Sequence, residues 1–432
     1  MNIIDIAKKY QDYIVAMRRY FHENPELSGE EWNTLATISR ELDSMGIEYV
    51  EIEKGGILAT IRGEKDNGRA VLLRADIDAL PVTESETNLT QKRTCISKNP
   101  GVMHACGHDA HAAMLLGAAK VLLEKRDEIE GTVYLCFERA EEDLGYVKGI
   151  MKYLDENQIK IDSALGIHIG VAAETGKLII NETYMMAGMM RFDITIEGQG
   201  GHGSRPHQAV SPVDAFVAIY NGLHTLHLNK ISPFEPLTWS VGVVESGNGA
   251  YNVIPQTLRF KGTMRTFDRD GVGMVFYNEM KKLVDSVCSI YGCKAIYNEY
   301  SLPRCGVVND AVSARFARDV IGREIGEENI ITKEPSRGGE TFRFYQMVYT
   351  GVFAFLGARN EEKGCAGKAH NEKFDIDEDS LHVGTASYAT YAIDFLKSDI
   401  NTSERQQEGG FKACLRRYQR YDILKELYGL DN

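Results

Sequence analysis

The sequence predicts an α/β protein in which a mostly parallel sheet forms one domain and an α+β sandwich is inserted as a second. Apolar runs of strand length alternate with helix-forming stretches, and these runs lie at 70–76, 132–137, 162–168 and 351–357. Strands that alternate with helices are typical of βαβ units and a parallel sheet. At 191–197, by contrast, apolar and polar residues alternate strictly, which indicates a half-buried strand of a different kind of sheet.

The inserted domain is expected at residues 187–300. Its elements follow a β-α-β-β-α-β order, with strands at 191–197, 237–246 and 257–267 and helices at 211–228 and 273–291. Residues 1–186 and 301–398 would form the outer domain, and residues 399–432 a charged tail that ends in a helix. The first thirty residues place apolar side chains at helical spacing, which predicts an amphipathic surface helix.

Composition restricts the partners and the compartment. The 432 residues carry 49 basic and 62 acidic side chains, a net charge of −13. This balance argues against nucleic acid as a partner, because phosphate binding needs clustered Lys and Arg. No apolar stretch approaches the roughly 18 residues of a membrane span, and the eight cysteines, irregularly spaced, form no disulfide framework. These features predict a cytoplasmic protein.

The densest group of metal-binding side chains is the segment MHACGHDAH at the start of an expected helix. Two geometries are compatible with its spacing. On one continuous helix, His104, His108 and His111 would share a face. If Gly107 instead marks a turn, Cys106 and His108 converge while the later histidines point elsewhere.

Three predicted strands lead into residues that can bind a metal or transfer a proton. These residues are Asp76, the adjacent pair Glu141 and Glu142, and His168. Ligands of open α/β sheets bind beyond the carboxyl ends of the strands, so the three positions are expected to meet there. Two adjacent carboxylates can divide the work, one binding metal and the other activating water.

Three longer motifs carry a family resemblance: RADIDALP at 74–81, MHACGHDAH at 103–111 and AEE at 140–142. They resemble the amidohydrolase branch of the aminoacylase and carboxypeptidase G metallopeptidase superfamily. That branch includes hippurate, indole-acetyl-amino-acid and aminobenzoyl-glutamate hydrolases and N-acetyl-diaminopimelate deacetylases. Shorter matches follow in family order, GIH at 166–168, GGHG at 200–203, NVIP at 252–255, GGE at 338–340 and AHN at 369–371.

The resemblance implies two adjacent divalent cations in the outer domain, either Zn²⁺ or Mn²⁺. Their implied ligands are Cys106, which would bridge the two ions, with His108, Glu142, His168 and His370. Glu141 would be the general base that deprotonates the metal-held water and later protonates the departing amine. Asp76 would orient His108, the usual support for a metal-bound imidazole. His104 and His111 would not be ligands.

The inserted domain resembles the family's lid, which also mediates dimerisation, so a homodimer or higher homo-oligomer is implied. His202 corresponds to the lid histidine that reaches a neighbouring subunit's active site and polarises the scissile carbonyl. Asn252 and Arg265 match positions that hold the substrate's carboxylate, a group that an arginine binds well.

The implied function is a metal-dependent hydrolase that cleaves the amide bond of an N-acyl amino acid or a related small amide. The alternatives are a dipeptidase or carboxypeptidase of the same superfamily, and a non-catalytic homologue that binds small molecules. The chain departs from the family pattern at Glu138 and Arg139, where Gln-Pro is usual, and at Thr341, where Asp is usual. The implied ligands and base are all present, so catalysis should be retained. The departures are therefore expected to affect the choice of substrate.

Overall fold

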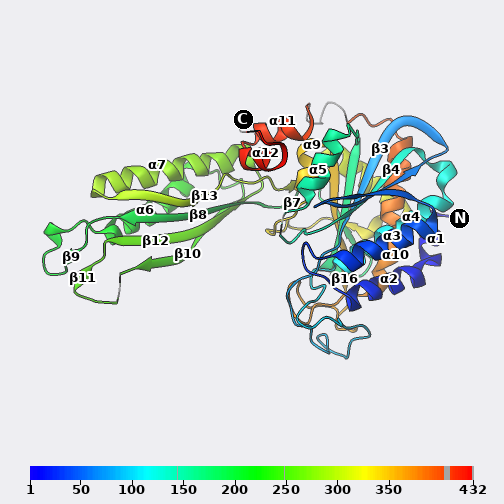
Figure 1. Cartoon of the computed structure of the whole chain (residues 1–432), viewed down its shortest axis with the longest axis horizontal. Helices are drawn as coiled ribbons and strands as arrows, with labels where there is room; N and C mark the ends of the chain where they lie inside the picture. Colours follow the sequence, from blue (N-terminus) through cyan, green and yellow to red (C-terminus); the bar gives the residue numbers. More distant parts are fainter. Residues whose placement is uncertain (144, 248, 403–408, 431–432) are drawn as a thin grey trace. The chain divides into compact units, whose positions relative to one another are not determined.

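The computed structural model describes residues 1–143, 145–247, 249–402 and 409–430, which form two compact units (Figure 1). The first unit comprises Met1–Met185, Val308–Glu334 and Glu340–Asn432, and the second comprises Met186–Val307 and Pro335–Gly339. A large mixed sheet lies in the first unit and a smaller antiparallel sheet in the second. The α/β class predicted from the sequence is therefore confirmed.

In the described residues, the sheet of the first unit has eight strands. Their spatial order is β1 (Glu48–Ile52), β2 (Gly56–Arg62), β4 (Glu130–Glu138), β3 (Lys65–Asp76), β5 (Ser163–Glu174), β16 (Gly351–Arg359), β6 (Leu178–Ile179) and β15 (Ile330–Ile331). The central strands β4, β3, β5 and β16 run parallel, while β1 and β2 pair antiparallel at one edge. Because the central strands point the same way, the loops after β3 and β4 emerge on one side of the sheet.

Side chains of β3 alternate between two faces of this sheet. Leu73 and Ala75 lie in the main apolar core, where α4 (His108–Glu124) and α10 (Leu381–Lys397) pack against β3. Arg74 points to the other face and contacts Thr341, which comes shortly before α9 (Arg343–Val348). Further helices of this unit are α1 (Ile3–Lys9), α2 (Gln11–Glu23), α3 (Trp32–Met45), α5 (Val147–Glu156) and α8 (Ala311–Ile325).

The N-terminal segment forms two helices where the sequence predicts one. α1 ends at Lys9 and α2 begins at Gln11, because Tyr10 leaves helical geometry, with φ −94° and ψ 5°. The predicted amphipathic character is confirmed, since Ile14 and Phe21 of α2 are buried in the main core.

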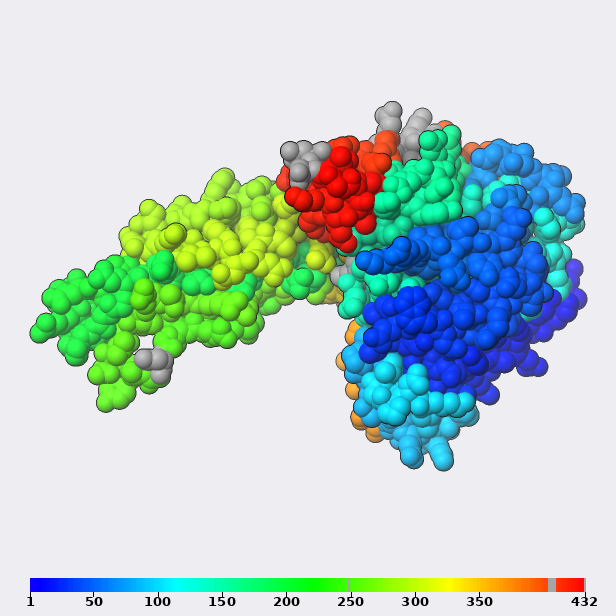
Figure 2. All heavy atoms as spheres, viewed as in Figure 1, coloured from blue at the N-terminus to red at the C-terminus, as the bar shows by residue number. Residues whose placement is uncertain are grey.

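The C-terminal segment packs on the first unit as two short helices, α11 (Gly410–Arg417) and α12 (Tyr421–Tyr428). Phe411, Leu415 and Leu424 are buried, and both helices lie against α5, as the red C-terminal atoms in Figure 2 illustrate. Residues 403–408 of the predicted tail lie outside the described residues.

The second unit is an antiparallel sheet with two helices. Its strands lie in the order β10 (Leu237–Ser246), β12 (Thr257–Thr266), β8 (Gly188–Glu197) and β13 (Lys294–Tyr300), and its helices are α6 (Pro212–Lys230) and α7 (Met274–Tyr291). Apolar residues of both helices and the sheet form its own core, among them Ile194, Leu223 and Phe276. A short ribbon of β9 (Gly201–His202) and β11 (Val253–Ile254) belongs to the same unit.

The second unit is larger than the predicted range of 187–300. It continues to Val307 and includes Pro335–Gly339, because Ser336 accepts a backbone hydrogen bond from Ala187 and Arg337 donates to Thr238. These contacts join segments far apart in the chain, which a linear pattern does not reveal. None of the helices in the described part of the chain is both long enough and apolar enough for a membrane span.

Candidate metal centre

Cys106 and His108 lie at a turn that leads into α4. Gly107 is the N-terminal cap of this helix and has φ +89°, a conformation that favours glycine. A Cβ at this position would also lie 2.6 Å from a methyl group of Ile169. The turn therefore decides between the two geometries that the spacing allows: His104 precedes the helix, so the three-histidine stripe does not form.

The other candidate ligands come from separate parts of the first unit. Glu141 and Glu142 follow β4 through Ala140, whose φ of +53° turns the chain sharply. His168 lies within β5, which continues to Glu174, so the prediction that it ends a strand is wrong. His370 lies in a loop, and its backbone N–H donates to the carbonyl of Ala105 at 2.8 Å.

Two groups of potential ligands share the sulfur of Cys106. One contains His108 and His168, the other contains Glu142 and His370, and the ligand atoms within each group lie within 4.8 Å of one another. The Cys106 sulfur is 3.5 Å from Nε2 of His168, and Nε2 of His370 is 3.3 Å from Glu142. The chain thus brings the other four predicted ligands together around the thiol of Cys106.

In both His108 and His168, Nδ1 bonds to a protein oxygen, so Nε2 is the nitrogen that could bind a metal. Nδ1 of His108 bonds to Asp78 at 3.0 Å, and Nδ1 of His168 bonds to the carbonyl of Ile169 at 2.8 Å. Nε2 of His108 and Oε1 of Glu142 are buried and make no hydrogen bond in the described structure, although Oε1 of Glu142 lies 3.3 Å from Nε2 of His370. Buried polar atoms without hydrogen bonds are costly, and this set of sulfur, imidazole and carboxylate groups fits divalent cations.

The carboxylate that supports His108 is Asp78, whereas the sequence predicted Asp76. Oδ1 of Asp78 bonds to the imidazole, and its Oδ2 accepts the backbone N–H of Glu142 at 3.1 Å. Asp76 comes no closer than 3.6 Å to Nε2 of His108 and is held by Arg74 at 2.7 Å. In the DID motif Asp76 ends β3 and Asp78 follows it, and only the direction of the chain at this point determines which carboxylate faces the imidazole.

His111 and His104 are not placed as ligands. Nδ1 of His111 bonds to Asp76, and its Nε2 accepts the backbone N–H of Ile169 at 2.7 Å, so both ring nitrogens are occupied. His104 is buried with neither nitrogen hydrogen-bonded in the described structure, and burial lowers its pKa to about 4.

Glu141 lies beside the ligand group and forms no ion pair with any residue that the structure describes. It is 6% exposed and accepts the backbone N–H of Thr341 at 2.9 Å. Burial, together with the nearby charges of Glu340 and Asp76, raises the pKa of Glu141 well above its ordinary value. For Glu142, burial is outweighed by His370 and His108, and the pKa is lowered. Two adjacent carboxyl groups with opposite shifts can serve as base and ligand.

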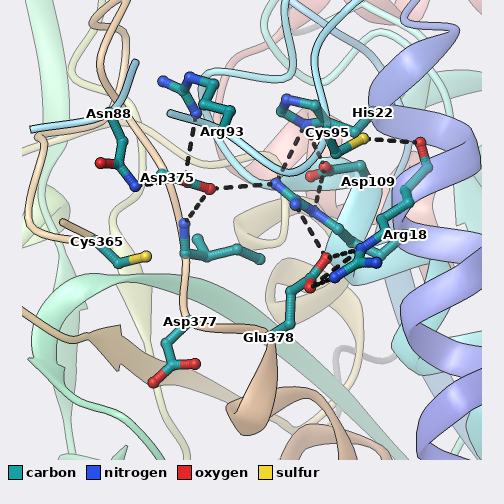
Figure 3. A network of polar contacts seen from close by, with 12 residues as sticks. Arg18, His22, Asn88, Arg93, Cys95, Asp109, Cys365, Asp375, Asp377 and Glu378 are labelled. Atoms are coloured by element: carbon teal, nitrogen blue, oxygen red, sulfur yellow. Dashed lines mark hydrogen bonds and ion pairs between the residues drawn. The ribbon is translucent and has the colours of Figure 1, made fainter. Parts of the chain in front are cut away.

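A buried polar network, which sequence reasoning did not identify, anchors the start of α4 (Figure 3). Asp109, the residue after His108, accepts hydrogen bonds from Arg18 at 2.9 Å and from His22 at 2.7 Å. Arg18 also reaches Glu378 at 3.2 Å. The network ties α2 to the helix that carries His108. Its members come from distant segments, so no local motif could have signalled it.

The three predicted lid residues lie in the second unit. His202 is exposed on β9, directly opposite Val253 of β11, and Gly203 donates to the carbonyl of Asn252 at 2.8 Å. His202 and Asn252 are therefore neighbours. Arg265 is half-buried on β12, and its side chain has no hydrogen-bond or ion-pair partner within the described ranges.

The model of the peptidase family M20/M25/M40 matches residues 72–394, most of the chain and including every proposed ligand and the base. The chain belongs to this family. The resemblance inferred from the motifs is thereby confirmed, and the protein is a metallohydrolase that acts on amide bonds.

Several curated proteins resemble this M20 enzyme along most of their length. Thermostable carboxypeptidase 2 of Saccharolobus solfataricus is 36% identical over 397 residues, which cover 90% of this chain and 97% of that protein. The N-acetylcysteine deacetylase of Bacillus subtilis is 34% identical over 395 residues, 90% and 99% of the two chains. The IAA-amino acid hydrolase ILR1-like 4 of Arabidopsis thaliana is 34% identical over 422 residues, 94% and 92%.

Solved structures of the same family match this M20 enzyme as well. The YXEP protein of Bacillus subtilis, a dinuclear metal binding peptidase, has a TM-score of 0.75 and 30% identity, with 90% of this chain and 99% of that chain covered. A putative aminohydrolase from methicillin resistant Staphylococcus aureus has a TM-score of 0.80 at 30% identity, with coverage of 92% and 100%.

Proposed function

We propose that this M20 enzyme holds two divalent cations and hydrolyses the amide bond of N-acyl amino acids. The observation that carries the proposal is the pair of ligand groups that share the thiol of Cys106, since one thiolate has lone pairs for two cations. Relatives named for deacetylation and for amino-acid conjugate hydrolysis support this substrate class. Thiolate and imidazole ligands favour Zn²⁺ by their softness, and Mn²⁺ is the alternative.

Glu141 is the proposed general base. Bound cations would supply Lewis acidity that makes a water more acidic and stabilises charge on the substrate's carbonyl oxygen. Glu141 would accept the proton of that water and pass it to the departing amine. Its raised pKa, caused by burial and by Glu340 and Asp76, suits a group that holds a proton between two steps.

The lid residues would bind the substrate. We place His202 at the scissile carbonyl of a neighbouring subunit, and Asn252 and Arg265 at the substrate's carboxylate. Burial lowers the pKa of Arg265, and a half-buried guanidinium without a partner in the described structure is suited to binding a carboxylate.

Replacing Glu141 with Gln tests the base. Glu141→Gln should retain both metals, measured by elemental analysis, and lose at least about 100-fold in kcat, the usual contribution of general base catalysis. Glu64→Gln is the matched control, because Glu64 is exposed. Unchanged turnover of N-acyl amino acids by Glu141→Gln would rule out this base.

Removal of metal tests the requirement for cations. Dialysis against a chelator should abolish turnover, and separate additions of Zn²⁺ and Mn²⁺ should identify the ion that restores it. Cys106→Ser should lose metal, because a serine hydroxyl does not ionise to bridge two cations, whereas the control Cys293→Ser in the second unit should not.

A peptidase is the second candidate, favoured by the 36% identity to a carboxypeptidase. The two activities differ in the group on the acyl side of the bond. A panel that compares acetyl- and benzoyl-amino acids with dipeptides of the same carboxyl-terminal residue separates them, and higher kcat/KM for the dipeptides would favour the peptidase.

We also propose that the second unit forms a homodimer. Its edge strand β10 exposes Val243 and Val244. α6 bears an exposed stripe at helical spacing, made by Val213, Val217, Tyr220, His224 and Leu228. A pairing edge beside an apolar stripe is typical of an interface. Val217→Glu should convert a dimer to a monomer in sedimentation experiments, while the control Ser286→Glu on α7 should not. A wild-type monomer would contradict the proposal.

A further inference from the structure

A buried group of polar side chains lies beside the proposed base but contains none of the ligands. Nε of Arg74 donates to Glu138 at 3.0 Å, and its Nη2 donates to Oγ1 of Thr341 at 2.6 Å. The hydroxyl of Thr341 donates in turn to Oε1 of Glu138. The other oxygen of Glu138 accepts the hydroxyl of Tyr345 at 2.8 Å. Each of these side chains is no more than 2% exposed.

Thr341 connects this group to Glu141. Its side chain is held on one side by Arg74 and Glu138, and its backbone N–H donates to Oε1 of Glu141 at 2.9 Å. The contacts of the Thr341 side chain therefore fix the direction of the Thr341 backbone N–H. Glu141 is thus held within the cluster of His108, Glu141 and Glu142, whose ligand atoms lie within 4.8 Å of one another.

Residues 138 and 341 contact each other and Arg74. The other charges around Arg74 favour a single carboxylate at these two positions. The guanidinium already meets Asp76 at 2.7 Å and Glu340 at 3.1 Å. Glu138 and Thr341 touch each other as well as Arg74, so carboxylates at both positions would repel at hydrogen-bond distance. Burial of unpaired charge is strongly unfavourable. Neutral residues at both positions 138 and 341 would therefore also be unfavourable, because Arg74 would have one carboxylate fewer around it.

We propose that Glu138, Thr341 and Arg74 act together as positioning residues for Glu141, and that positions 138 and 341 must supply one carboxylate and one neutral hydrogen-bonding group. This inference rests on the proposed role of Glu141 as the base. It also accounts for two departures from the family pattern at once. The chain has Glu and Thr at the positions where the family pattern has Gln and Asp, and moving the carboxylate across this contact would leave the charge facing Arg74 unchanged.

A charge-exchange cycle tests the proposal. In Thr341→Asp, two carboxylates face each other, and kcat should fall about 50-fold, within the range of coupling between residues in contact. In the double variant Glu138→Gln with Thr341→Asp, the amide donates to the new carboxylate, and kcat should return to within about fivefold of wild type. KM should change less than kcat in each variant, and metal content should stay constant.

Two further measurements keep the test independent of folding and of the reaction. Thr341→Val removes the hydroxyl at nearly constant shape and should lower kcat about tenfold. Amide hydrogen exchange in the peptide around residues 339–343 of the metal-free protein should accelerate in Thr341→Asp and slow again in the double variant. Tyr391→Phe is the control, because it removes a buried hydrogen bond to Ser163 (2.6 Å) at the start of β5, before His168.

The outcomes separate this inference from the proposed function. Wild-type kcat in Thr341→Val, or a double variant no better than Thr341→Asp, overturns the positioning role. If Glu141→Gln retains turnover, Glu141 is not the base. The proposal that Glu138, Thr341 and Arg74 position the base is then wrong as well, whatever the cycle shows. If Glu141→Gln is inactive but the effects of Glu138→Gln and Thr341→Asp simply add in the double variant, the positioning role is wrong while the proposed base is retained.

Discussion

Asp78 bonds to Nδ1 of His108 at 3.0 Å and, through its other oxygen, to the backbone N–H of Glu142 at 3.1 Å. One carboxylate therefore orients two of the proposed ligands. Asp78→Asn should weaken metal binding about 10- to 100-fold, the usual effect of losing such a support, because an amide has one accepting oxygen and cannot serve both donors. Competition with a chelator measures the affinity. Asp162→Asn is the control, since the Asp162 carboxylate accepts the backbone N–H of Ala70, a residue outside the ligand group. Unchanged affinity in Asp78→Asn would contradict its role.

His111 joins the last residue of β3 to β5, next to the proposed ligand His168. It bonds to Asp76 and accepts the N–H of Ile169, the residue after His168. His111→Phe should leave that buried N–H unpaired, at a cost of about 1–3 kcal/mol in the free energy of unfolding. His111→Gln offers an oxygen in place of Nε2 and should recover part of the loss. Urea unfolding of the metal-free protein measures both values; equal stability of the two variants would argue against the contact.

His22 should make stability depend on pH. Burial and Arg18 act to lower the pKa of His22, but Asp109 and Glu84 outweigh them, and the pKa is raised. A raised pKa in the folded state gives stability that is full below the unfolded value of about 6.5 and is lost as pH rises through the folded value. The difference in unfolding free energy between wild type and His22→Gln should therefore shrink from about pH 5.5 to about pH 8.5. A difference that is constant or grows over this range would contradict the assignment.

The C-terminal helices should contribute to the stability of the first unit. Leu424 is fully buried, and the sulfur of Cys414 lies 2.9 Å from the carbonyl oxygen of Met347 in α9. Leu424→Ala should destabilise the protein by about 2–5 kcal/mol, as for other buried leucines, and lower the thermal midpoint. Leu430→Ala is the control because Leu430 is exposed. Equal midpoints for the two variants would show that the packing of α12 contributes little.

The elements of the fold were predictable where local patterns are strong. The strand at 237–246 has the predicted ends, and the helices after Ser211 and Gly273 begin within one residue of the predicted start. The break at Tyr10 and the extension of β5 beyond His168 were not predictable. Each depends on backbone geometry at a single position or on pairing with β16, and neither leaves a periodic signal.

By itself, the sequence determined the family and the chemical types available at the centre: one thiol, three imidazoles and two adjacent carboxylates in a fixed order. The tertiary structure decided which of them meet and what supports them. Asp78 rather than Asp76 orients His108, and Glu138 and Thr341 share one contact with Arg74. Such pairings join residues separated by up to 267 positions. They are set by the direction of side chains on neighbouring strands and loops, which short motifs do not encode.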